Sequence, residues 1–190
     1  MSSSKISLGT TGFFLDVTLD DVEEGFISSF HGQLRKKGDD TIYPILYWQI
    51  VNVPVGIQRI GNISFALDVD GSTEPFTSLY DISRGVYREQ VAKAMNVRPH
   101  DVSHSLLVLN GLNCDSAEPI DDNALSLAIK EIERTQNFNI GLTGYFTDTH
   151  NHDSQTFVSF LFKDGFQKLN YDGFVSQDAA MFFRPKIASL

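Results

Sequence analysis

One short stretch of this sequence gathers the residue types of a metal site. It reads D-T-H-N-H-D and contains Asp148, His150, His152 and Asp153. Carboxylate and imidazole groups are common zinc ligands, and alternate side chains of a strand share one face, so these side chains could converge on an ion. Asp, Asn and His are also frequent in exposed turns, because they tolerate turn conformations. No distant Cys or His partner can be identified. We therefore favour a solvated turn and keep the metal site as the alternative.

Other groupings have simpler explanations than catalysis. The stretch Asp68–Glu74 resembles part of a calcium loop, but its first and twelfth ligands are missing. His100, Asp101 and His104 have serines nearby, yet no G-x-S-x-G motif accompanies them. Cys114 is the only cysteine, which excludes an internal disulfide and a cysteine-based zinc site. We expect no cofactor, and enzymatic activity is the less favoured interpretation.

The metal candidates must be positioned by the segment Ile140–Lys163, which predicts a β-hairpin. Its second run, T-F-V-S-F-L-F, has apolar residues on both faces. Such a strand is either central in a sheet or an edge that pairs with another chain. Phe157, Phe160 and Phe162 are therefore candidate interaction residues.

The first half of this hairpin has a counterpart near the N-terminus. Gly9–Asp16 reads G-T-T-G-F-F-L-D, and Gly141–Asp148 reads G-L-T-G-Y-F-T-D. The similarity suggests a pseudo-repeat of two β-hairpins. The first hairpin carries an acidic tip around Asp20 and Asp21, with Gly25 turning the chain into its second strand.

Aromatic residues are frequent elsewhere as well. The most apolar segment, Tyr43–Val55, predicts a central strand buried on both sides. Its residues Tyr43, Tyr47 and Trp48 have the rings that stack on sugars or bases. In a two-faced apolar strand such residues more often belong to the core.

The remaining pattern predicts about eight strands and two helices. Helices are expected over Ser83–Asn96, and from Asp121 or Asp122 to Arg134, where apolar residues recur at helical spacing. Further strands are expected over Asn62–Val69, Ser103–Leu109 and Ala179–Phe183. We predict an α+β fold: a mainly antiparallel β-sheet or sandwich, with the two helices in the middle of the chain packed on one face.

Composition limits the partners of the protein. The 190 residues are 42% hydrophobic and 21% charged, which is typical of a globular protein, and we expect a single domain over residues 1–190. The net charge is −9, and Arg35, Lys36 and Lys37 form the only basic cluster, so we expect no nucleic-acid binding. No apolar run suggests a membrane span or a signal peptide, which predicts a cytoplasmic protein, with release by a non-classical route as an alternative.

Two functions from different classes follow. The first is a non-enzymatic interaction or self-assembly protein, such as a subunit of a viral, phage or bacterial multimer or an effector-like binding protein. It would form a homo-oligomer or bind a protein partner. The alternative is a small metal-binding or hydrolytic enzyme that uses the His and Asp residues of the loops.

Overall fold

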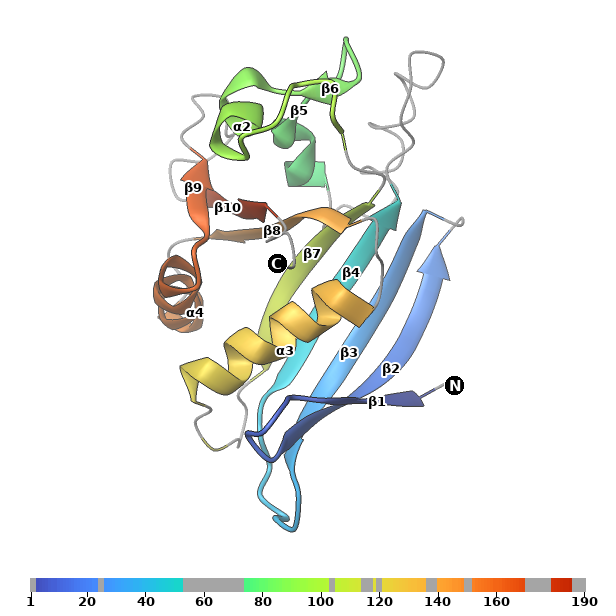
Figure 1. The fold of residues 1–190 in the computed structure, drawn as a ribbon, viewed down its shortest axis with the longest axis vertical. Coiled ribbons are helices and arrows are strands. Elements are labelled where there is room, and N and C mark those ends of the chain that lie inside the picture. Colours follow the sequence, from blue (N-terminus) through green and yellow to red (C-terminus); the bar gives the residue numbers. More distant parts are fainter. Residues whose placement is uncertain are drawn as a thin grey trace.

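The chain folds around one large β-sheet (Figure 1). The structure is a computed structural model, and it describes residues 3–23, 26–52, 74–102, 105–113, 118, 121–135, 140–148, 152–169 and 179–185. The strands of the large sheet are β1 (Ser3–Ser7), β2 (Phe13–Glu23), β3 (Ile27–Lys36), β4 (Ile45–Asn52), β7 (Ser105–Asn113), β8 (Ile140–Asp148), β9 (Gln167–Leu169) and β10 (Ala179–Pro185). A separate pair comprises β5 (Tyr80–Asp81) and β6 (Val86–Tyr87). The helices are the 3-10 helix η2 (Glu74–Leu79) and the α-helices α2 (Glu89–Ala94), α3 (Asp122–Thr135) and α4 (His152–Lys163).

The large sheet has eight strands in the order β1-β2-β3-β4-β7-β8-β10-β9. β7 and β8 run parallel, and the other neighbouring pairs run antiparallel. A parallel pair needs a crossover connection, and α3 lies in the chain between these two strands. The predicted α+β class, with a mainly antiparallel sheet, is confirmed.

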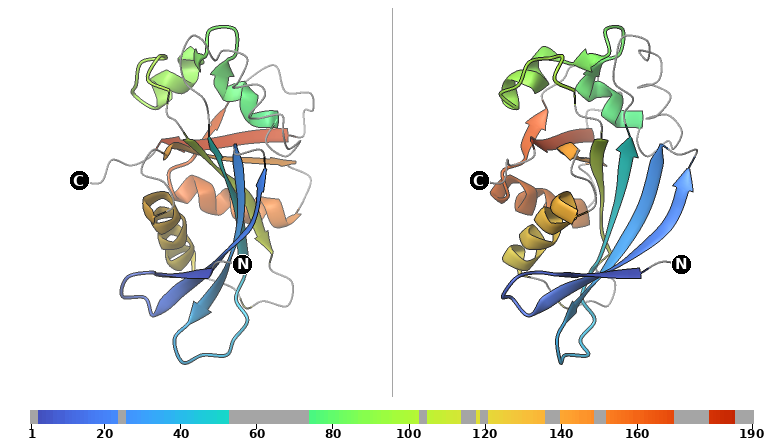
Figure 2. Two further views of the ribbon diagram at one scale, coloured as in Figure 1. Left: turned by 90° about the vertical axis from the view of Figure 1, so that its right-hand side faces the viewer. Right: turned by 45° about the vertical axis from the view of Figure 1, so that its right-hand side comes forward.

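Two apolar clusters lie on opposite faces of the sheet. Successive residues of β7 alternate between them: Leu107 and Leu109 belong to the first cluster, and Leu106 and Val108 to the second. Helices α3 and α4 pack in the first cluster, whereas η2, β5, β6 and α2 pack in the second. Figure 2 shows the second group together at one end of the molecule, away from α3 and α4. Of the two helices predicted to share one face, α3 covers the first face and α2 lies on the other.

Helix α3 matches its prediction closely. Leu125, Ala128, Ile129 and Ile132 form the expected apolar stripe, and all four are buried. The carboxylate of Asp121 accepts the backbone N–H of Asn123 at 3.0 Å, which caps the first turn. Within the described residues, no helix has the length and apolarity that a membrane crossing requires.

The helix predicted over Ser83–Asn96 forms only in its second half. Gly85, with φ of 64°, instead lies in the tight turn between β5 and β6. The predicted end is confirmed, because Asn96 adopts a φ of 54° directly after α2. The N–H of Val97 then donates to the carbonyl oxygen of Ala92 at 3.0 Å, as in a Schellman C-cap.

The hairpin predicted over Ile140–Lys163 is wrong in its second half. β8 forms as expected, but the run T-F-V-S-F-L-F belongs to helix α4. The run fits both periods: it is apolar on both faces of a strand, and Phe157, Phe160 and Leu161 also recur at helical spacing. Those three residues are buried against the first cluster, so tertiary packing favours the helix.

The proposed pseudo-repeat is also wrong. Gly9 and Gly12 lie in the turn between β1 and β2, whereas Gly141 and Gly144 both lie in strand β8. β2 pairs with β1 and β3, while β8 pairs with β7 and β10, so the two segments are not neighbours. The first hairpin itself, β2–β3, is confirmed with its acidic end at the turn.

Candidate interaction surface

The predicted metal residues lie at the junction of β8 and α4. Asp148 is the last residue of β8, His152 and Asp153 are the first two of α4, and His150 lies outside the described residues. Strand alternation cannot align His152 with Asp148, because His152 belongs to a helix. The metal site therefore stays a prediction. Among the side chains that the structure does describe, no group of three or more His, Cys, Asp or Glu is placed to hold a metal ion.

The second group of chemical candidates is only partly described. Ser103, His104 and Cys114 lie outside the described residues. Asp101 binds the guanidinium of Arg98 through both carboxylate oxygens, at 3.1 and 3.0 Å. These hydrogen bonds hold the pKa of the Asp101 carboxyl below its usual value. Asp101 therefore acts as the partner of a surface arginine.

The predicted interaction residues of α4 divide into two kinds. Phe157 and Phe160 are core residues, each 5% exposed, and they stack on one another. Phe162 lies on the opposite side of the helix and is 52% exposed. The run is helical, so it forms no strand edge, and binding of a partner by these residues stays a prediction.

The aromatic residues of the β4 segment also divide. Trp48 and Tyr43 are buried in the first cluster, which confirms the prediction that they belong to the core. Tyr47 is the exception, because its ring projects from the other face of β4 and is 37% exposed. It therefore lies on the face of the sheet opposite the first cluster.

This face belongs to strands β1 to β4. Their other face carries Leu15, Leu34, Leu46 and further members of the first cluster, on the side where α3 packs (Figures 1 and 2). On the opposite face, the described members of the second cluster from β3 and β4 are Ile27 and Val51, which pair across the strands at one end. Apart from Gln49, which is 4% exposed, the other described side chains of that face are half-buried or exposed, and we call it the open face.

The strand register arranges the open face in rows across the sheet. One row is Ser3–Thr18–His31–Tyr47, the next is Lys5–Asp16–Gln33–Ile45, and a third is Ser7–Phe14–Arg35. A bulge in β2 between Leu19 and Asp21 precedes a fourth row, Asp21–Ser29–Gln49. Directly opposed residues of neighbouring strands share a face, so these rows form one continuous surface.

Two aromatic contacts hold side chains of the open face in place. The ammonium of Lys5 lies 5.0 Å from the centre of the Phe14 ring. The rings of His31 and Tyr47 are tilted, with centroids 6.1 Å apart. His31 Nδ1 is also 2.7 Å from an Asp20 carboxylate oxygen. The exposed rings are therefore ordered by neighbours from other strands.

Charge is distributed unevenly along the open face. Asp20 and Asp21 lie at the end near the β2–β3 turn, and both are exposed. Arg35 lies three rows away, at the other end of β3, and its Nε is 3.1 Å from an Asp16 carboxylate oxygen. Three rows correspond to roughly 20 Å along the strands. The face therefore has an acidic end and a basic end.

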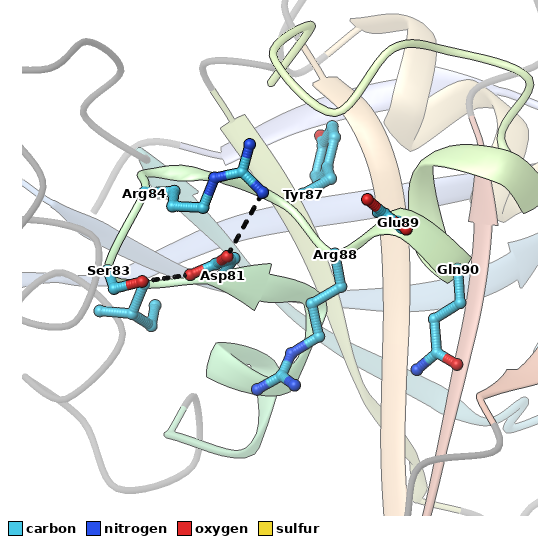
Figure 3. A pocket seen from close by; sticks show the side chains of 8 residues that line it. Asp81, Ser83, Arg84, Tyr87, Arg88, Glu89 and Gln90 are labelled. Carbon is cyan, nitrogen blue, oxygen red and sulfur yellow. Dashed lines mark hydrogen bonds and ion pairs between the residues drawn. The ribbon is translucent and has the colours of Figure 1, made fainter.

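A pocket of about 800 Å³ lies elsewhere, against the segment 81–90 (Figure 3). The side chains of Asp81, Arg84 and Arg88 contribute to its lining. Asp81 accepts a hydrogen bond from Ser83 at 2.7 Å, which holds its pKa below the usual value, and lies 3.9 Å from Arg84. Arg88 Nε donates to the carbonyl oxygen of Tyr80 at 3.0 Å. The charged side chains of the pocket wall thus contact one another or the backbone, which is a structural role.

A buried ionic network lies between α3, β10 and the turn after α4. Arg184 Nη2 donates to Glu133 Oε1 at 2.7 Å, and its Nη1 binds the carboxylate and the backbone oxygen of Asp164. The three side chains are 3%, 6% and 7% exposed. Because solvent and partners cannot reach these groups, the network has a structural role.

Sequence reasoning missed the open face, although two of its signals were visible. The sequence contains an acidic run at Asp20 and a basic run at Arg35. Their place at opposite ends of one predicted hairpin would have indicated a charge gradient. The exposure of Tyr47 carried no such signal, because its segment is apolar on both faces. No protein-family model, curated protein or solved structure matches this chain.

Proposed function

We propose that this chain is a non-enzymatic protein-interaction module whose recognition surface is the open face of β1 to β4. One observation supports the proposal most strongly: the four strands pack one face into the first cluster and present ordered aromatic and charged side chains on the other. The predicted interaction function is kept, while its site moves from α4 to the open face.

The composition of the open face suits protein recognition. Aromatic residues and arginine contribute much of the binding energy at interfaces, and here Tyr47, Phe14 and Arg35 are at least partly exposed. They stand on paired strands, so little conformational entropy is lost when a partner binds. Polar residues such as Thr18 and Gln33 lie between them. Specific interfaces commonly combine such apolar anchors with polar surroundings.

Site-specific photocrosslinking tests this proposal. A benzophenone amino acid replaces Tyr47 in one variant and Phe162 in the other, and each is irradiated in an extract of cells that make the protein. Phe162 is the matched control, because it is an aromatic residue of greater exposure outside the open face. We expect protein adducts from position 47 and markedly fewer from position 162. Equal yields, or no adduct from position 47, would contradict the proposal.

Substitution of the central aromatic gives a second measurement on any adduct partner. Tyr47→Ser removes an exposed ring without creating a cavity, so stability should change little. The dissociation constant for the partner should rise about tenfold, as expected for an interface aromatic. Phe162→Ser should leave it unchanged.

A further inference from the structure

We propose that the open face binds a second copy of this chain, with the two sheets stacked face to face about a two-fold axis. This inference rests on the proposed function and specifies its partner. The axis lies in the plane of the interface and runs parallel to the rows, so each strand stacks over its own copy in the opposite direction. Two-fold interfaces require a self-complementary surface, and the open face meets that requirement in charge and in the polarity of its facing residues.

The charge gradient along the open face is self-complementary under this rotation. The rotation exchanges the two ends of the face, so Asp21 of one copy comes near Arg35 of the other. The acidic end keeps a net negative charge: no ion pair joins Asp21 to any described residue, and only His31 pairs with Asp20. At the basic end, Asp16 opposes Lys5 in the register and binds Arg35, which leaves one positive charge in excess. The dimer therefore contains two attractive contacts, each between the acidic end of one copy and the basic end of the other.

The two central rows of the face are also compatible with a two-fold axis. With the axis between the two central rows, Tyr47 of one copy lies over Ile45 of the other, and His31 over Gln33. Thr18 then lies over Asp16, so like charges do not oppose one another. The two-fold placement thus brings apolar side chains together on β4 and polar side chains together on β2 and β3.

The size of the face sets the strength of the association. Four strands about 4.8 Å apart and four rows about 6.7 Å apart present roughly 500 Å² per copy. The roughly 1,000 Å² buried in a dimer is at the lower limit for a specific interface. The net charge of −9 on each copy also opposes association. We therefore expect a weak, reversible dimer that forms at high protein concentration.

Charge reversal with sedimentation analysis tests the pairing. Asp21→Lys and Arg35→Glu each place like charges opposite one another in a homodimer, so each should raise the dimer dissociation constant at least tenfold. A mixture of the two variants restores both attractive contacts, and so does the double variant. Net charge alone predicts another result, because Asp21→Lys reduces the overall repulsion and would strengthen association.

Two further variants control the experiment. Glu89→Lys makes the same charge change at an exposed residue of α2, outside the open face, and should not weaken the dimer. If Arg35→Glu is unstable next to Asp16, the same reversal in an Asp16→Asn background removes that repulsion. Folding of each variant is checked by thermal melting.

The results separate this inference from the proposed function. A wild-type chain that stays monomeric at millimolar concentration, or a mixture of folded variants that does not associate, overturns self-pairing. Crosslinks from position 47 to a different protein would also overturn it, while supporting the proposed function. Crosslinks between two copies, with restored association in the mixture, would support both.

Discussion

Gly32 shows how a single residue limits the packing of the core beneath the open face. A Cβ at this position would lie 2.7 Å from Leu15 Cδ1 and 2.9 Å from Trp48 Cζ3. The Trp48 ring is fully buried and stacks on Phe30, so it has no space into which to move. We expect Gly32→Ala to lower the free energy of unfolding by about 1–3 kcal/mol. Urea denaturation measures this, and Ser28→Ala on the same strand should change it by less than about 0.5 kcal/mol.

A second prediction concerns the carboxyl group that holds the β3–β4 loop. The side-chain and backbone groups of Thr41 donate to Asp39 Oδ1, and Tyr43 Oη donates to Oδ2 at 3.0 Å. The Thr41 hydrogen bonds are the main reason that the Asp39 pKa lies below its ordinary value of 3.8. A pKa lowered by folding stabilises the protein above pH 3.8, and this contribution is lost as pH falls through the lower value.

NMR titration of the Asp39 carboxyl should therefore give a midpoint below 3.8. Asp39→Asn should lower stability at neutral pH and flatten the loss of stability at acidic pH. Asp40→Asn is the matched control, because this neighbouring carboxylate is exposed and should leave both properties unchanged. A normal midpoint for Asp39 would contradict the prediction. The sequence indicates only a loop here, since the hydrogen bonds depend on the loop's conformation.

At the scale of elements, periodicity predicts α3 well and α4 poorly. The stripe of α3 fits only the helical period, because its polar residues occupy the other positions. The run in α4 is apolar at both periods, so the local pattern cannot decide between helix and strand. Packing of Phe157 and Phe160 against the sheet decides it, and that contact depends on residues far away in the chain. The resemblance between Gly9–Asp16 and Gly141–Asp148 suggests a second hairpin, but helix α4 follows β8.

The buried side chain of Arg184 connects three elements, and its loss should destabilise the fold. The residue joins β10 to α3 and to the turn after α4, and it lies 4.8 Å from the Phe166 ring centre. Arg184→Met removes the guanidinium from two buried carboxylates, which should cost about 3–5 kcal/mol. Glu133 then keeps only the hydrogen bond from Thr143 among its described contacts, while Asp164 keeps those with Ser126 and Lys130. Chemical denaturation measures the loss. Arg134→Met is the matched control, because Arg134 pairs with Glu131 on the exposed side of α3 and should cost less than about 1 kcal/mol.

At the scale of the whole molecule, composition and strand patterns predict the α+β architecture but not the use of the sheet's faces. The order of the strands decides which face each helix covers, and it depends on the crossover between β7 and β8. Likewise, each row of the open face joins residues of three or four strands, and no local pattern encodes the register. The charged ends of the β2–β3 hairpin are the part of this site that the sequence does indicate.

The two apolar clusters predict how the molecule unfolds. β4 and β7 each contribute to both, since Ile50 and Leu107 belong to the first cluster while Val51 and Leu106 belong to the second. Loss of one cluster therefore removes packing from two strands that also contribute residues to the other cluster. The predicted single domain over residues 1–190 implies that both clusters melt in one transition.

Phe76→Ala tests this coupling from one face of the sheet to the other. Phe76 is 1% exposed in the second cluster, and its truncation should cost about 3–5 kcal/mol. Trp48, the only tryptophan, reports on the first cluster by fluorescence. In a single cooperative unit, the urea midpoint by Trp48 fluorescence falls by the same amount as the midpoint by circular dichroism. A Trp48 midpoint that stays at the wild-type value would instead divide the molecule into two independently folding halves.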